Sequence, residues 1–376
     1  MRIAQIAPVF ESVPPRLYGG TERVVSYLTE ELVAQGHEVT LFASGDSRTS
    51  ARLVSSFHEA LRLSAAPLDE LAAQILLVEQ VIAEADQFDV IHNHIDYLPF
   101  PMLRRARRPN VSTPHGRLDG AHWRVLVEQF PELPLSSISF AQRRSLPDAN
   151  WVATVYHGIP ADQHRFRARH GDYLAFVGRI SPEKRVDRAI EIARGCGMPL
   201  KIAAKVSELD LAYFERQIRP LLDDPLVDFL GEVDEAGKDE LLGNAHALLF
   251  PIDWPEPFGL VMIEAMACGT PVIAYRHGSV PEIVQDGVNG FIVDDLPGAI
   301  AAVDRIVELD RGCCRELFEA RFTARRMAAD YADLYAQLVE DGAPARRVIP
   351  IDVRARPAAL VPIPENRDGE RSTATA

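Results

Sequence analysis

Residues 1–43, MRIAQIAPVFESVPPRLYGGTERVVSYLTEELVAQGHEVTLFA, decide the fold class. Residues 2–7 form a short apolar run that is typical of a buried strand, and residues 38–43 form another. Between them, residues 21–35 predict a helix, because apolar side chains recur every four residues and Gly36 stands where helices often end. The order strand, loop, helix, strand is typical of a doubly wound α/β domain with a parallel sheet.

The same alternation continues along the chain. Further strands are expected at 89–92, 174–177, 200–203, 227–229, 247–250, 271–274 and 290–293, with helical patterns between most of them. The sequence therefore predicts two Rossmann-like, doubly wound parallel-sheet domains, at 1–157 and 158–322. Residues 314–340 have a helical apolar pattern, and the Ala-, Pro- and Arg-rich end at 343–376 predicts a disordered tail.

Composition excludes several classes of function. The net charge of −14 argues against nucleic acid as a partner, because phosphate backbones are bound by clustered lysines and arginines. The four cysteines form no CxxC and no metal-binding spacing with histidine, so we expect reduced thiols. No stretch approaches 18 uninterrupted apolar residues, and the first residues are too interrupted for a signal peptide. A cytoplasmic protein is expected, with peripheral contact at the inner face of the membrane as the less favoured alternative.

Two short segments in the expected loops favour an anionic ligand. Gly19 and Gly20 follow the first strand and open the first helix, where free backbone N–H groups favour an anion, although a simple tight turn would explain the glycines as well. In the second half, FVGRISPEK at 176–184 ends a strand at Gly178 and places Arg179 and Lys184 five positions apart. An arginine fork and a lysine charge suit a diphosphate, and a solvated loop is the alternative.

The segment 250–269, FPIDWPEPFGLVMIEAMACG, is the most informative. A helix that starts near Phe258 would be apolar all round, and such a helix is buried. Glu264 lies inside it, and a buried carboxylate requires a partner. Sugar hydroxyl groups would supply one; a buried arginine or a backbone cap is the alternative. Glu256 precedes the helix, whose first N–H groups would face a phosphate.

Histidines gather at strand ends in the first half. His92 and His94 end the strand at 89–92, and His115 follows a short strand. A zinc site would need a third ligand at a recognisable spacing, so we expect no metal. The basic run of Arg104, Arg105, Arg107 and Arg108 is interpreted as a solvated helix end in preference to a patch for a membrane surface or an anionic acceptor.

Together these residues resemble the retaining glycosyltransferases of family 4, which have the GT-B fold of two Rossmann-like domains facing across a cleft. The resemblance runs from residue 1 to about 338, and its most specific part is Glu256 and Glu264 with seven residues between them. The other segments, including 322–327, follow in the expected order. The resemblance implies that a helix near 323–341 packs back onto the first domain.

The resemblance also implies roles for individual residues. Arg179 and Lys184 would bind the diphosphate and hold its growing charge, Glu264 the ribose and Glu256 the transferred sugar. His115 would contact the donor sugar or the acceptor, with His94 also on the acceptor side. Further donor-site candidates are Gly19, Gly20, Lys205, Val233, Phe258, Gly259 and Leu260.

The function implied is retaining transfer of a sugar from a nucleoside-diphosphate sugar to an unidentified acceptor, in the synthesis of a glycoconjugate, a polysaccharide or a small-molecule glycoside. A UDP-sugar is favoured over a GDP-sugar, and no cofactor or metal is expected. A GT-B nucleotide-sugar epimerase and a non-catalytic nucleotide-sugar binding protein are the alternatives.

Overall fold

The structure, a computed structural model, describes residues 1–17, 19–65 and 68–343. The tail predicted at 343–376 lies outside the described residues apart from residue 343. The first half contains the strands β1 Arg2–Ile6, β2 Glu38–Phe42, β3 Arg52–Val54, β4 Val90–Asn93, β5 Asn110–Ser112, β6 Leu135–Ser137 and β7 Trp151–Thr154. Its helices are α1 Gly20–Ala34, α2 Glu70–Ala83, α3 Phe100–Ala106, α4 Ala121–Gln129 and α5 Phe140–Arg143.

The second half repeats the pattern. Its strands are β8 Leu174–Ile180, β9 Leu200–Val206, β10 Val227–Gly231, β11 Ala247–Phe250, β12 Val272–Tyr275 and β13 Gly290–Val293. Its helices are α6 Val186–Cys196, α7 Leu211–Tyr213, α8 Glu235–Gly243, α9 Leu260–Cys268, α10 Val280–Ile283 and α11 Leu296–Arg305, followed by α12 Arg311–Arg321 and α13 Ala324–Asp341.

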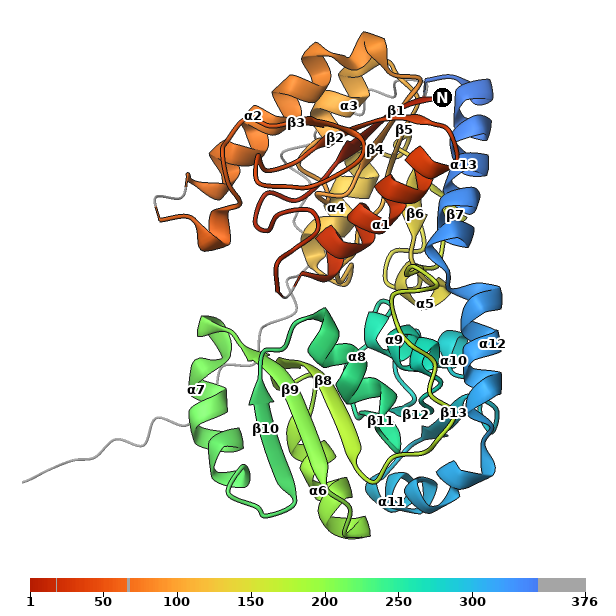
Figure 1. Ribbon diagram of the computed structural model, residues 1–376. Helices are drawn as coiled ribbons and strands as arrows, with labels where there is room; N and C mark the ends of the chain where they lie inside the picture. Colours follow the sequence, from red (N-terminus) through yellow and green to blue (C-terminus); the bar gives the residue numbers. More distant parts are fainter. Residues whose placement is uncertain (18, 66–67, 344–376) are drawn as a thin grey trace, which may run out of the picture.

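Two parallel sheets form the two halves, which lie one above the other in Figure 1. The strand orders are β3-β2-β1-β4-β5-β6-β7 and β10-β9-β8-β11-β12-β13. Both orders reverse beside their first strand, between β1 and β4 and between β8 and β11. Ligands of open α/β sheets bind at the carboxyl ends of the strands next to such a reversal. The prediction of two doubly wound parallel sheets is confirmed.

Several predicted boundaries were wrong. The strands β3, β6 and β7 were not predicted, because runs of three or four residues show almost no periodicity. The strand expected at 174–177 continues to Ile180, because β9 is equally long and pairs with it to the end: Arg179 is opposite Lys205, and Ile180 is opposite Val206. Arg179 therefore lies within a strand and not in a loop.

The helical pattern at 314–340 is two helices and not one. The first helix ends at Arg321, and Thr323 caps the second, since its Oγ1 accepts a hydrogen bond from the N–H of Arg326 at 3.2 Å. At this break the N–H of Ile159 donates to the carbonyl of Phe322 at 3.0 Å. The two segments that connect the halves thus lie side by side, and α13 runs along the first half against α1 (Figure 1).

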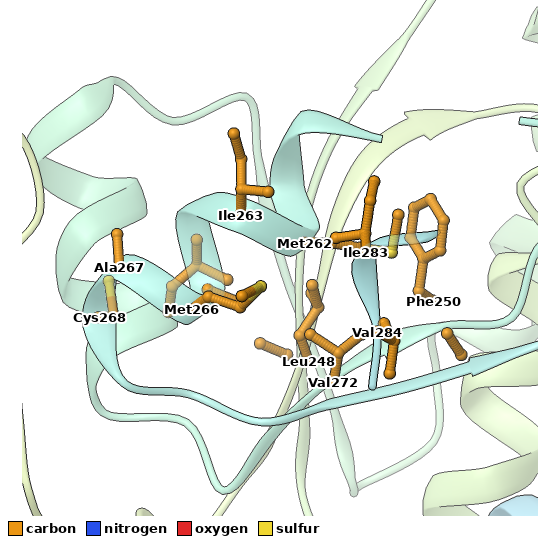
Figure 2. Close-up of a cluster of buried hydrophobic side chains, with 14 of the residues drawn as sticks. Leu248, Phe250, Met262, Ile263, Met266, Ala267, Cys268, Val272, Ile283 and Val284 are labelled. Carbon is orange, nitrogen blue, oxygen red and sulfur yellow. The ribbon is translucent and has the colours of Figure 1, made fainter. Parts of the chain in front are cut away.

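The helix α9 is buried in an apolar core, where it packs against β11, β12, α8 and α12. Figure 2 shows Met262, Ile263 and Met266 of α9 among Leu248, Val272 and other side chains of this cluster. Because α9 is buried along almost its whole length, its start is fixed relative to the strand ends. Among the described residues, no helix is both long and apolar enough to cross a membrane.

Candidate active site

A cavity of about 520 Å³ lies between the two halves, at the carboxyl ends of the central strands. Of the thirteen residues that the sequence suggested for the site, the cavity wall contains all except His94. The twelve are Gly19, Gly20, His115, Arg179, Lys184, Lys205, Val233, Glu256, Phe258, Gly259, Leu260 and Glu264. Segments from both halves therefore line one cavity, next to the point where each strand order reverses.

The starts of two helices face this cavity. Gly20 opens α1, and a side chain added there would come within 3.7 Å of Leu260, the first residue of α9. The helix predicted to start near Phe258 starts at Leu260, because Gly259 has a φ of +83°, which a helix excludes. A side chain at Gly259 would also meet Met262 at 2.8 Å. The free N–H groups of both helix starts form a place for an anion.

The backbone of Glu256 is held by close contacts with Gly278 and Ser279. A side chain at Gly278 would come within 2.2 Å of the carbonyl oxygen of Glu256, and the N–H of Ser279 donates to that oxygen at 2.9 Å. The carboxylate forms an ion pair with the ammonium group of Lys184, which also lies 5.0 Å from the ring centroid of Trp254. Lys184 thus stands beside the sugar-binding candidate with further donor hydrogens available to a ligand.

Arg179 and Lys205 are neighbours because their strands pair in register. The guanidinium of Arg179 lies 2.5 Å from Glu183 and 3.3 Å from Asp210, and its side chain is 39% exposed. It is therefore held in place but still reachable from the cavity. Arginine in this position offers several N–H donors to a diphosphate.

Glu264 has a partner that the sequence did not reveal. Its carboxylate lies 2.6 Å from the ammonium group of Lys238, on α8. Burial alone would raise the pKa of Glu264, but Lys238 and His164 outweigh it and the pKa is lowered. Burial likewise opposes the charge of Lys238, yet Glu264 and Glu235 raise its pKa. Both groups are therefore charged, and the cavity offers an ionised carboxylate to hydroxyl groups.

An ion pair crosses from one half to the other beside this lysine. Arg23 of α1 lies 2.9 Å from Glu235 of α8, and the same carboxylate oxygen is 2.9 Å from Lys238. A chain of charges thus connects the first half to Glu264. Arg23, Glu235 and Lys238 all line the cavity.

The histidines form a cluster in the wall of the first half. His94 is buried behind His115, and its Nδ1 lies 3.0 Å from Nε2 of His115. His157, from the connecting segment, lies 3.4 Å from the other nitrogen of His115 and packs its ring against Phe258. Burial lowers the pKa of His115 to about 3, so this ring is neutral.

Two groups of potential metal ligands occur among the described residues, and each is already balanced by a cation. The first group is His164, Glu235 and Glu264, and both glutamates in it pair with Lys238. In the other group, Asp239 lies 2.9 Å from Arg167. An ion at either place would compete with these cationic side chains for the carboxylates. The basic run also has partners, since Arg104 pairs with Glu132 and Arg108 with Asp86.

Sequence reasoning missed Arg23, His157, Glu235 and Lys238. The need of Glu264 for a partner was a usable signal, but sugar hydroxyl groups or an arginine were expected in place of a lysine. Nothing local connects Lys238 with Glu264, because the contact exists only once α8 packs against α9.

Comparison with known proteins agrees with this geometry. Residues 18–176 match the model of the family "Glycosyltransferase Family 4", and residues 162–311 match "Glycosyl transferases group 1". The chain is 28% identical to a phosphatidyl-myo-inositol mannosyltransferase of Mycolicibacterium smegmatis, over 90% of this chain and 92% of that protein. It is 26% identical to a glycogen synthase of Mycobacterium tuberculosis, over 85% and 89%.

Solved structures share the fold. A sucrose-phosphate synthase from Thermosynechococcus elongatus superposes with a TM-score of 0.73 at 19% identity, over 91% of this chain and all of that one. The Anabaena protein HepE, in complex with UDP and glucose, gives a TM-score of 0.69 at 18% identity, over 90% of this chain and all of that one. The prediction of a GT-B fold is confirmed.

Proposed function

Because this chain belongs to the family-4 glycosyltransferases of GT-B fold, we propose that it transfers a sugar, with retention of configuration, from a nucleoside-diphosphate sugar to an acceptor bound in the cavity. One observation carries the proposal: Arg179, Lys184, Glu256 and Glu264 line a single cavity that both helix starts face. Cations and amides suit the diphosphate, and the carboxylates suit the hydroxyl groups of ribose and sugar.

The charges of the cavity wall support one orientation of the donor. The ribose lies against Glu264, which Lys238 keeps ionised, and the transferred sugar lies against Glu256. The diphosphate lies between Arg179, Lys184 and the start of α9. The base lies toward Lys205 on β9 and Val233 in the loop after β10, which both line the cavity.

The charge that develops on the leaving diphosphate determines what the site must stabilise. As the bond to the sugar breaks, the diphosphate gains negative charge, which Arg179, Lys184 and the helix N–H groups are preorganised to stabilise. No metal is required in this scheme, since two cationic side chains already face the phosphates. Retention follows if the acceptor attacks from the side of the leaving group and a phosphate oxygen takes its proton. Glu256 then binds sugar and does not act as a nucleophile.

We propose a UDP-sugar as the first donor to test, and a cytoplasmic location. The UDP donor is supported by the complex of the similarly folded HepE with UDP and glucose. The location is supported by four cysteines that are all free thiols. The curated relatives, a phosphatidyl-myo-inositol mannosyltransferase and a glycogen synthase, differ in the acceptor that their names imply, so the acceptor is left to experiment.

The test is a screen followed by product analysis. Nucleoside-diphosphate sugars are screened by thermal shift, because a ligand of the native state raises its melting temperature. The donor that binds is then incubated with candidate acceptors, and NMR determines the anomeric configuration of the product. Retention without added metal supports the proposal. An inverted product, or conversion of the donor without acceptor as in an epimerase, contradicts it, and so does binding without any turnover.

A further inference from the structure

A chain of buried hydrogen bonds runs from α13 through the first sheet to the cavity wall. Its first link joins the hydroxyl of Tyr335 to Nε2 of Gln5 at 3.1 Å. Oε1 of Gln5 lies 2.6 Å from Nε2 of His94. From there, Nδ1 of His94 is 3.0 Å from Nε2 of His115, whose Nδ1 is 3.4 Å from Nε2 of His157. Only the last two rings line the cavity.

The hydrogen bonds between the three rings must all be donated in the same direction along the series. Burial lowers the pKa of His94, His115 and His157, so each ring is neutral. A neutral imidazole has one N–H donor and one lone pair. A ring that accepts from one neighbour must therefore donate to the other, and the tautomer of one ring determines those of the next two.

Gln5 sets this direction, because one end of its amide only accepts hydrogen bonds and the other end only donates them. Its amide oxygen faces His94 and has no hydrogen to donate, so Nε2 of His94 carries the proton. Nδ1 of His94 then accepts from Nε2 of His115, and Nδ1 of His115 accepts from Nε2 of His157. The amide nitrogen of Gln5 donates to the hydroxyl of Tyr335, and that hydroxyl also lies 2.6 Å from Nδ1 of His92, to which it can donate its own hydrogen.

His157, the last ring of the hydrogen-bonded series, favours the same direction of donation. Nδ1 of His157 is buried and has no hydrogen-bond partner among the described residues. In the direction set by Gln5 this atom is an unused lone pair. In the reverse direction it would be a buried N–H without an acceptor, and such groups are rarer in proteins than under-used acceptors.

We propose that Gln5 is a positioning residue that fixes the tautomers of His94 and His115, so that His115 offers an unprotonated Nδ1 to a hydroxyl group of the bound sugar. The link from this nitrogen to His157 is the longest in the chain, at 3.4 Å, and is the one that a hydroxyl group would replace. The contact with sugar rests on the proposed function. The tautomers do not, since they follow from the protein alone.

NMR of the full chain with ¹⁵N-labelled histidine tests the tautomers directly. His94→Gln and His115→Gln assign the signals. We expect the wild type to carry the ring proton on Nε2 of both histidines, and Gln5→Met to give a mixture of tautomers at both. The control is Thr40→Val, which removes a buried polar group from the neighbouring strand β2. A wild-type proton on Nδ1 of either ring, or a Gln5→Met spectrum with unchanged tautomers, would overturn the proposal.

Turnover supplies the second readout. With the donor identified, Gln5→Met should lower kcat/KM about tenfold, the worth of one hydrogen bond, while the affinity for the nucleotide alone stays within about twofold. Wild-type kcat/KM in a variant with mixed tautomers would overturn the role of Gln5 in sugar binding. If no nucleotide sugar is turned over at all, the proposed function fails, and the NMR result still decides the role of Gln5.

Discussion

The ammonium group of Lys238 lies 2.6 Å from the carboxylate of Glu264, and both side chains are almost completely buried. Neither charge is stable alone at this depth, because the protein interior solvates an isolated ion poorly. The pair therefore keeps an ionised acid inside the cavity before any ligand arrives. Glu264 can then accept hydrogen bonds from a ribose without first losing a proton.

Replacing Lys238 by Met should destabilise the fold by about 3–5 kcal/mol, because it leaves Glu264 as a buried unpaired acid. Urea denaturation at neutral pH measures the loss. The double variant Lys238→Met with Glu264→Gln should recover most of it, since no buried charge is then unpaired. Equal stability of the single and double variants would show that Lys238 does not compensate Glu264.

Replacing Glu264 by Ala should weaken nucleotide binding about 10- to 100-fold, which corresponds to losing hydrogen bonds to a charged group. Isothermal titration with the nucleotide measures the affinity. Glu240→Ala is the control, because Glu240 is on the same α8 as Lys238 but pairs with Arg167. An unchanged affinity for Glu264→Ala would assign this residue to structure alone.

The candidate site residues that lie close together in the sequence were the ones that could be predicted. Glu256 and Glu264 belong to one loop and helix, and Arg179 and Lys184 to one strand and the loop after it. Lys238 and Arg23 could not be predicted, because their partners are 26 and more residues away and meet them only through helix packing. Likewise, the sequence placed His92, His94 and His115 at strand ends, but the position of His94 behind His115 depends on how two parallel strands end side by side.

Replacing Lys184 by Ala should lower kcat by roughly 100- to 1000-fold, because one preorganised contact to developing charge is worth about 3–4 kcal/mol. Steady-state kinetics with the identified donor measures the effect. Lys201→Ala is the matched control: this lysine is on β9 of the same half and stacks on Tyr173 outside the cavity. A wild-type kcat for Lys184→Ala would remove Lys184 from the mechanism.

Replacing Arg23 by Gln should loosen the two halves relative to each other, since Arg23 and Glu235 pair across the cavity. Electron spin resonance with one spin label on each half should show a broader distance distribution than in the wild type. Arg2→Gln, which breaks a pair with Asp89 inside the first half, should leave the distribution unchanged. Identical distributions for Arg23→Gln and the wild type would show that this pair does not hold the halves together.

The buried histidines should make the fold sensitive to mild acid. Burial lowers the pKa of His92, His94, His115 and His157, and for His115 the value falls from 6.5 to about 3. Below about pH 6.5 the unfolded chain therefore binds protons that the folded chain does not, and the free energy of unfolding falls as the pH falls. The change amounts to at most about 1.4 kcal/mol per pH unit for each histidine.

Replacing His115 by Gln should therefore flatten the pH dependence of stability between about pH 6 and 5, by up to about 1.4 kcal/mol per pH unit. Urea denaturation at a series of pH values measures the slope. Thr113→Val is the control, because it removes a hydrogen-bond partner of His92 but no titratable group, and should lower stability without changing the slope. A slope for His115→Gln equal to that of the wild type would mean that His115 takes up its proton in the folded chain as readily as in the unfolded one.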